Sequence, residues 1–283
     1  MDIQKTIGNV LKRKRGNLLL HTILIIGSVS MILPFVWMLL TSFKTFGESM
    51  AVPIVLFPAK LRPDSYEKVL DILPFGSLYY NTIALIFWRV VCATVFSSMA
   101  AFAFAKLEFP FRNTLFILVL VQFMLPPQIY IIPQYLLLAK FQLLNSMFAL
   151  VFPGLISTFG TFFLRQYYLS LPNELSEAAK IDGCSIGKTF LFILLPLTKT
   201  ALMALTIFTA LFAYRDMMWP LIVNMKLEMM TLSAGISTLV GAHVTEYPDL
   251  MAASTLAIFP MLILYLVIQR RFVEGIALSG SKT

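Results

Sequence analysis

Long apolar runs separated by short polar segments make up most of the chain. A helix that crosses a bilayer needs about 20 mostly apolar residues, because the hydrocarbon core is about 30 Å thick and each helical residue rises about 1.5 Å. The pattern predicts an all-α integral membrane protein with six transmembrane helices. These predicted spans cover about 18–40, 80–104, 115–138, 145–164, 197–214 and 250–268.

Two predicted spans have irregular features. The third contains Pro126, Pro127 and Pro133, which predict a kink or a re-entrant end because proline lacks a backbone donor. The first follows the basic cluster 12–15, as the core of a signal peptide does. Its apolar stretch exceeds the roughly 7–15 residues of a signal sequence and no small-x-small site follows, so we expect an uncleaved span.

Composition agrees with the pattern. Hydrophobic residues make up 59% of the 283 residues and charged residues 13%, against about 45–50% and about 25% in soluble domains. The mean hydropathy is +0.84. This excludes a soluble enzyme, a disordered regulator or a secreted disulfide scaffold. The two cysteines, Cys92 and Cys184, suggest no disulfide.

The basic residues predict the orientation. With the N-terminus inside, the inner segments 1–17, 105–114, 165–199 and 269–283 hold 14 of the 22 Lys and Arg, the outer segments hold seven, and Arg89 lies within a span. Short cytoplasmic segments carry such an excess in membrane proteins. We therefore expect cytoplasmic N- and C-termini. The net charge of +8 then reflects topology and not nucleic-acid binding.

The inner segment 165–199 is predicted to be more than a connector. Helix-forming residues follow Pro172, with Asn173 as the expected N-cap. Gly183 lies where this short helix should end, since glycine adopts the left-handed conformation readily. A second short helix should begin at Ser185, whose hydroxyl can cap it, and run into the fifth span near Pro196. We call this helix–turn–helix, about 170–196, the elbow.

The elbow carries a spaced motif. Glu177-Ala178-Ala179 is followed by Asp182-Gly183 and then by Ile193-x-Leu195-Pro196. This closely resembles the EAA motif of ABC-importer permeases. From about Asn81 onward the chain is similar to the maltose-type permease subunits of carbohydrate ABC importers. Loop 36–79 adds little to this resemblance. The supporting stretches are 105–110 (AKLEFP), 132–137 (IPQYLL), 163–167 (FLRQY), 219–222 (WPLI) and 269–275 (QRRFVEG).

The resemblance implies a permease subunit of a bacterial, ATP-driven, binding-protein-dependent sugar importer in the cell membrane. Its implied partners are a second permease subunit, two ATP-binding cassette subunits and an extracytoplasmic solute-binding protein. ATP and Mg would bind to the ATPase, and this chain would bind no cofactor. The implied domains are 1–79, with the first span and outer loop, and 80–283, a five-helix permease core with the elbow and tail.

The resemblance also assigns roles to residues of the elbow. Glu177 is expected to pair with a basic group of the ATPase, because a partly desolvated ion pair gives directional coupling. Ala178 and Ala179 would keep the helix face flat. Gly183 would permit the turn, and Asp182 would cap its amides. The remaining motif residues would fix the elbow to the bundle, and the tail would reach the ATPase through Gly280 and Lys282, although it lacks the family's final glycine.

No catalytic site is expected in this chain. Residues 183–189 resemble a phosphate-binding loop, but only three residues separate the first glycine from Gly187-Lys188-Thr189, where four are needed. His21 and His243 are far apart, and no metal-ligand spacing occurs. We therefore expect a transport subunit and not an enzyme.

Polar residues in the spans and outer loops are candidates for further roles. Arg89 could bind a ligand hydroxyl or gate residue, form a structural pair with a neighbouring helix, or extend toward the outer lipid headgroups. We expect Tyr214-Arg215-Asp216 to provide interfacial anchoring and a local ion pair. Candidates for the translocation path are Gln122, Ser157, Thr158, Thr161, Thr206 and Thr209. Candidates for contact with the binding protein are Thr245, Glu246, Tyr247 and Asp249.

Small residues predict one close helix contact. Ala93, Ser97, Ala101 and Ala105 recur every four residues, which lets backbones approach closely. We expect this stripe to pack within the chain, with a dimer seam as the alternative.

Three alternative functions remain at this point. The first is the same fold importing a non-sugar solute such as a glycerol phosphodiester or a polyol. The second is a secondary carrier or channel, which has no use for an ATPase-docking motif. The third is a membrane enzyme, which the absence of a catalytic constellation opposes.

Overall fold

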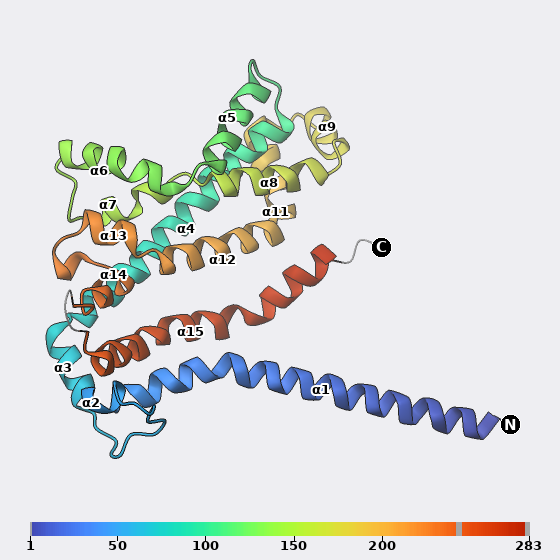
Figure 1. Ribbon diagram of the computed structural model, residues 1–283. Helices are drawn as coiled ribbons and strands as arrows, with labels where there is room; N and C mark the ends of the chain where they lie inside the picture. Colours follow the sequence, from blue (N-terminus) through green and yellow to red (C-terminus); the bar gives the residue numbers. More distant parts are fainter. Residues whose placement is uncertain (1, 242–244, 281–283) are drawn as a thin grey trace. The chain divides into compact units, whose positions relative to one another are not determined.

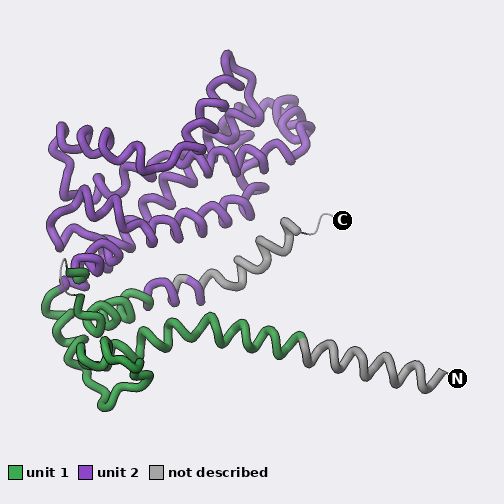
Figure 2. Tube along the Cα trace, viewed as in Figure 1, with its two compact units in different colours: residues 1–72, 239–258 green, residues 73–238, 259–283 purple. Residues whose placement is uncertain are grey.

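The computed structural model describes residues 2–241 and 245–280, with side chains from residue 20 to residue 266 except 242–244 and 264. The described part is helical and contains no strand, which confirms the all-α prediction. It divides into two compact units (Figure 2): unit 1 comprises residues 1–72 and 239–258, and unit 2 comprises residues 73–238 and 259–283.

Unit 1 is built on helix α1 (Asp2–Thr41), with α2 (Phe46–Ser49), α3 (Asp64–Ile72) and the first part of α15 (Tyr247–Gly280). Within α1, Leu20–Thr41 is long and apolar enough to cross a membrane, close to the predicted span. Its apolar side chains are exposed all round, for example Ile25 at 62%. A helix with this distribution suits a surrounding of lipid and not of water.

Buried polar contacts secure the segment after α1. Lys44 is buried, its Nζ donates to the carbonyl of Val55 at 2.7 Å, and it lies 4.0 Å from the centre of the Trp37 ring. Burial lowers the pKa of Lys44, although the nearby Glu48 opposes this. Thr45 and Glu48 form a capping box at the start of α2. These contacts fix the loop between α1 and α3.

Unit 2 is centred on the long helix α4 (Phe75–Lys106), which packs against α8 (Thr158–Ser170) and α12 (Lys199–Arg215). Figure 1 shows α6 (Ile131–Lys140), α7 (Met147–Val151) and α13 (Met218–Val223) at one end of the unit, with α9 (Glu174–Ile181) and α11 (Leu195–Leu197) at the other. The remaining elements are α5 (Arg112–Met124), η1 (Pro127–Tyr130), η2 (Phe152–Gly154), α10 (Ile186–Lys188), η3 (Thr189–Leu194), η4 (Leu227–Met229) and α14 (Leu232–Ser237).

Helices α4 and α8 approach closely along the predicted small-residue stripe. Ala93, Ser97 and Ala101 are buried. A Cβ atom at Gly160 of α8 would lie 2.7 Å from Ser97 Oγ, so a larger residue there would force a neighbouring group to shift. The Ser97 hydroxyl donates to the carbonyl of Ser157 at 3.1 Å. The stripe therefore packs within the chain, as expected.

Three apolar segments are bent helix pairs, two within predicted spans and one where the elbow meets the fifth. The bend is 99° between α5 and the η1–α6 segment, 43° between the α7–η2 segment and α8, and 77° between Ile186–Leu197 and α12. Leu125 and Pro126 have extended ψ angles of 135° and 132°, because each precedes a proline. Pro133 lies in the first turn of α6, where its missing N–H costs little. The predicted kink is therefore confirmed at Pro126.

The bends affect the number of spans. Among the described residues, two helices can cross a membrane by length and composition, and five spans result if each bent pair counts as one. Tyr247–Ile263 is a shorter apolar helix that overlaps the predicted sixth span.

Candidate functional site

The turn of the elbow has the geometry of a helix C-terminus. Gly183 has a φ of +75°, in the left-handed region. The N–H of Gly183 donates to the carbonyl of Lys180 at 3.1 Å, and the N–H of Cys184 donates to that of Ala179 at 2.9 Å. This pair of bonds is a Schellman motif, which satisfies the last carbonyls of α9. The predicted role of Gly183 in the turn is confirmed.

The second arm of the elbow begins as predicted. Ser185 is the N-cap of α10, and its Oγ accepts from the N–H of Lys188 at 3.4 Å. The arm continues through η3, which is a π-helix, into α11. Pro196 precedes the 77° bend, since it cannot donate to the helix ladder.

Asn173 is the N-cap residue of α9, as predicted, but its backbone is helical and its side chain accepts no amide of the helix. Its Oδ1 instead accepts from Nζ of Lys106, the last residue of α4, at 2.8 Å. The Asp182 carboxylate likewise makes none of the hydrogen bonds found among the described side chains, and only its backbone N–H binds back, to Ala178.

Helix α9 has one packed face and one open face. Ala179 is 3% exposed and Leu175 packs against an apolar cluster that includes Leu164, Tyr168 and Leu194. The open face carries Glu174, Glu177, Ala178 and Ile181, which are spaced as neighbours on a helix and are all exposed.

Ile181 is 85% exposed and, at the start of the second arm, Ile186 is 61% exposed. Sequence reasoning missed both residues, although an isoleucine next to Lys180 on a short polar helix was a usable signal. The elbow thus presents an acidic and apolar surface that nothing in the described part of the chain covers.

The other motif residues lie on the second arm. Ile193 packs against the same apolar cluster that holds α9. Leu195 is half-buried and Pro196 is exposed. Ile193 thus attaches the arm to the bundle, as expected.

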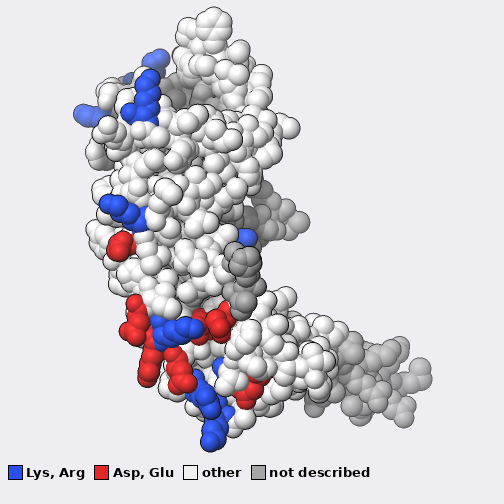
Figure 3. Space-filling model, turned by 60° about the vertical axis from the view of Figure 1, so that its left-hand side comes forward, with Lys and Arg blue, Asp and Glu red and all other residues white. Residues whose placement is uncertain are grey.

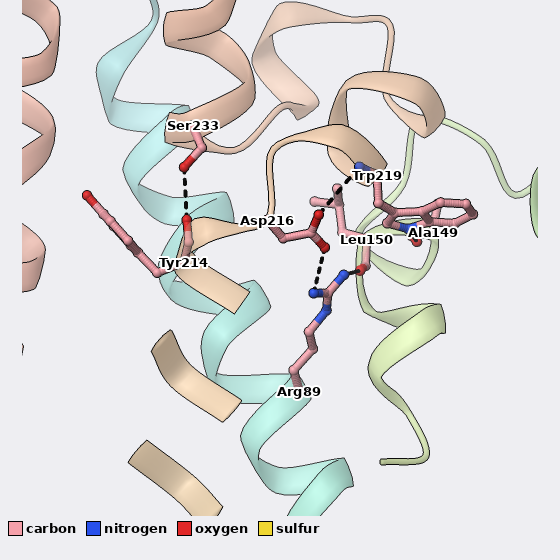
Figure 4. Close-up of polar contacts among 7 residues, drawn as sticks. All are labelled: Arg89, Ala149, Leu150, Tyr214, Asp216, Trp219 and Ser233. Carbon is pink, nitrogen blue, oxygen red and sulfur yellow. Dashed lines mark hydrogen bonds and ion pairs between the residues drawn. The ribbon is translucent and has the colours of Figure 1, made fainter. Parts of the chain in front are cut away.

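Arg89 of α4 is at the centre of a polar network that includes Leu150 of α7 and Asp216, the residue after α12 (Figure 4). Its Nη1 lies 2.8 Å from Oδ2 of Asp216, and its Nη2 donates to the carbonyl of Leu150 at 2.7 Å. Asp216 Oδ1 also accepts from the N–H of Trp219 at 3.4 Å. Arg89 therefore forms the structural pair, and the expected local ion pair was wrong, because Asp216 pairs across helices and not with Arg215.

The candidate path residues fall into two groups. Ser157 caps α8 by accepting from the N–H of Gly160 at 2.9 Å, and the Thr161 hydroxyl donates to the Ser157 carbonyl at 3.0 Å. Thr158 adjoins them at the first residue of α8. Three others make none of the side-chain hydrogen bonds found in the described part of the chain: Gln122, Thr206 and Thr209. The structure therefore groups only the residues at the start of α8.

The candidates for contact with a binding protein lie in unit 1. Glu246 and Asp249 help to line a cavity of about 200 Å³, together with Lys44, Thr45, Phe46, Arg62, Asp64, Ser65, Lys68 and Pro248. Asp249 forms an ion pair with Lys68. The hydrogen bond of this ion pair raises the pKa of Lys68, and the partial burial of Lys68 opposes the shift. Tyr247 is exposed and Thr245 half-buried. Figure 3 shows acidic and basic side chains gathered in one region of the face drawn, with further charged side chains elsewhere on it.

Two further predictions concern the tail and a phosphate-binding loop. Gly280 is the last residue of α15, and Lys282 lies outside the described residues. Residues 183–189 comprise the turn after α9, all of α10 and the first residue of η3, and they follow a helix and not a strand, so they lack the setting of a phosphate-binding loop.

The geometry defines a class of protein: an apolar helical bundle with bent spans and an exposed helical elbow. Comparison with known proteins agrees with this class. Residues 93–277 match the family described as binding-protein-dependent transport system inner membrane component. The chain belongs to this family, and it is thus a membrane transport subunit.

Similar proteins cover nearly the whole chain. It is 34% identical over 257 residues to the arabinooligosaccharides transport system permease protein AraQ of Halalkalibacterium halodurans, which covers 89% of this chain and 91% of the relative. It is 31% identical over 264 residues to the sn-glycerol-3-phosphate transport system permease protein UgpE of Escherichia coli, covering 90% and 94%. A crystal structure of a bacterial ABC transporter involved in alginate import has a chain of the same fold, with a TM-score of 0.75, 21% identity, and coverage of 91% and 96%.

Proposed function

We propose that the chain is one of two permease subunits of a bacterial, ATP-driven, binding-protein-dependent importer, with a sugar or oligosaccharide as cargo. The observation that carries this proposal is the open face of α9. Glu177, Ala178 and Ile181 are exposed there, while Ala179 on the opposite face is buried in the chain's own bundle. An ordered helix that leaves an apolar side chain 85% exposed is suited to docking with a partner.

The partner that fits the elbow is an ATPase subunit, present in two copies, which holds ATP and Mg. Glu177 would pair with a basic group on it, and Ile181 would add apolar contact. ATP-driven closure of the ATPases would displace the elbows and change the access of the path from inward to outward. An extracytoplasmic binding protein would deliver the solute, with residues 245–249 as its contact on this chain. The family match supports this assembly and argues against a lone carrier, a channel or an enzyme.

The proposed topology has six spans, with both termini in the cytoplasm. Two of these spans would be the bent pairs of α5 with η1–α6 and of α7–η2 with α8. The others would be α1, α4, α12 and α15. The excess of basic residues in the segments placed inside supports this orientation.

A phosphorylated glycerol is the second candidate cargo. Similarity to sn-glycerol-3-phosphate permeases is almost as high as similarity to arabinooligosaccharide permeases. The test is to purify the tagged chain from membranes of its native host, identify the co-purified ATPase and binding protein, and reconstitute the complex in liposomes. Stimulation of ATP hydrolysis by the binding protein is then measured with pentose oligosaccharides, hexose oligosaccharides, alginate fragments and sn-glycerol 3-phosphate. Stimulation by a saccharide supports the proposal, and stimulation by sn-glycerol 3-phosphate alone overturns the sugar cargo.

A further inference from the structure

Lys106, the last residue of α4, is bound to the segment that leads into the elbow. Its Nζ donates to the carbonyl of Leu171 at 2.7 Å and to Oδ1 of Asn173 at 2.8 Å. These acceptors flank Pro172, in the connection between the end of α8 and the start of α9. One ammonium group thus joins α4 to the entrance of the elbow.

The other contacts that hold α9 against the bundle are less directional. Leu175 and Ala179 hold α9 against the bundle through apolar packing, which is non-directional. Pro172 has no N–H to donate, so it adds no backbone bond to this connection. The two charge-assisted hydrogen bonds of Lys106 fix the position of the connection along α4, because such bonds are short and directional.

Two other basic residues of this region bind carbonyls, but neither reaches the elbow. Arg112 Nη1 donates to the Leu107 carbonyl at 3.0 Å. Arg165 Nε donates to the Phe104 carbonyl at 3.3 Å, and its guanidinium lies 4.0 Å from the centre of the Phe116 ring. Among these three cations, Lys106 alone connects a span to the elbow.

We propose that Lys106 is a positioning residue for coupling: it makes α4 follow the displacement of the elbow. This inference rests on the proposed docking of the elbow to an ATPase. Helix α4 is suited to pass the movement on, because it packs along both α8 and α12 and carries Arg89 near its middle. Coupling between distant sites travels through such chains of packed helices and hydrogen bonds.

The test uses the reconstituted complex with Lys106→Met, Lys106→Arg and the matched control Lys140→Met. Lys140 is also the last residue of its helix, but it is exposed and makes none of the hydrogen bonds found in the described part of the chain. Three quantities are measured: ATPase subunits retained, ATP hydrolysed, and solute taken up per ATP. We expect Lys106→Met to retain the ATPase subunits and their ATP hydrolysis, while solute uptake per ATP falls about tenfold. A change of this size corresponds to the loss of a hydrogen bond made by a charged group. Lys106→Arg should restore most of the uptake, and Lys140→Met should match the wild type.

A double-mutant cycle with Asn173→Ala separates coupling from general stability. Asn173→Ala should lower uptake per ATP less than Lys106→Met does, and the double variant should be no worse than Lys106→Met alone. Wild-type uptake per ATP in Lys106→Met, loss of its ATPase subunits, or additive losses in the double variant each overturn the inference while leaving the proposed function intact. A wild-type complex without any ATPase overturns both.

Discussion

Arg89 and Asp216, which lie 127 positions apart in the sequence, form an ion pair with Nη1 2.8 Å from Oδ2. The pair joins α4 to the residue that follows α12, and the second guanidinium nitrogen binds the Leu150 carbonyl of α7. Gly154 lies directly against the Arg89 side chain, since a Cβ atom at position 154 would be 2.7 Å from Arg89 Cδ. One side chain therefore holds three helices together.

The first prediction is that Asp216→Asn destabilises the protein more than Arg89→Met does. Asp216→Asn leaves a guanidinium of 9% exposure without its counter-charge, whereas Arg89→Met leaves a carboxylate of 22% exposure that water can reach. Removing one partner of a buried pair costs about 3–5 kcal/mol. Thermal unfolding in detergent measures the difference. The exposed neighbour Arg215 gives the control: Arg215→Ala should unfold at the wild-type temperature. Equal unfolding temperatures for Asp216→Asn and the wild type would show that the pair is not stabilising.

The second prediction concerns the contact of α4 with α8. Gly160→Ala places a methyl group 2.7 Å from Ser97 Oγ, so the two helices must separate or the Ser97–Ser157 hydrogen bond must break. We expect a loss of about 1–3 kcal/mol, as for other overpacked sites. Ser97→Ala in the same chain should recover part of this loss by removing the hydroxyl. Gly76→Ala, where a Cβ meets nothing within 4 Å, is the control. A double variant no more stable than Gly160→Ala would contradict the contact.

The third prediction tests the elbow. A Cβ atom at position 183 would meet no atom of this chain within 4 Å, and aspartate adopts the left-handed conformation with less strain than most residues. We therefore expect the Gly183→Asp and Glu177→Ala variants to reach the membrane at wild-type levels but to lose transport. Each substitution would disturb the contact with the docked partner and not the fold of this chain. Co-purification of the ATPase and uptake measure this outcome. Glu108→Ala, another exposed acidic residue, should behave as wild type. Normal uptake in both elbow variants would contradict the proposed role of the elbow in docking.

Local sequence signals predicted the local features of this fold. Leu125 precedes a proline, so the chain must leave the helix there, and the bend follows. Gly183 and Ser185 likewise reveal the turn of the elbow, since capping depends on neighbouring residues. The partner of Arg89 was not predictable, because Asp216 and the Leu150 carbonyl reach it only through tertiary packing.

Asn173 is a second residue whose side-chain partner was not predictable from neighbouring residues. Its position at the start of a helix predicts a cap, but the Lys106 ammonium is a stronger donor to its side chain than an amide of α9. The candidate site was therefore predictable as a motif, and its attachment to α4 was not.

The last prediction concerns the pH dependence of the loop between α1 and α3. The N–H groups of Thr45 and Ala59 donate to the carboxylate of Glu48 at 2.8 and 3.0 Å, and these bonds lower the pKa of Glu48 from its ordinary value of 4.5. A carboxyl group with a lower pKa in the folded state stabilises that state fully above the ordinary value, and the contribution is lost as the pH falls through the folded pKa. The hydrogen-exchange protection factor of the Ala59 amide should therefore fall below pH 4.5 in the wild type.

Glu48→Gln should remove this dependence, because an amide does not titrate and its single acceptor oxygen cannot serve both loop amides as the carboxylate does. The protection of Ala59 should then be lower than in the wild type at neutral pH and unchanged on acidification. Glu67→Gln is the matched control, since Glu67 is exposed on α3 and makes none of the hydrogen bonds found among the described side chains. It should keep the wild-type profile. Parallel profiles for Glu48→Gln and the wild type would mean that another group fixes this loop.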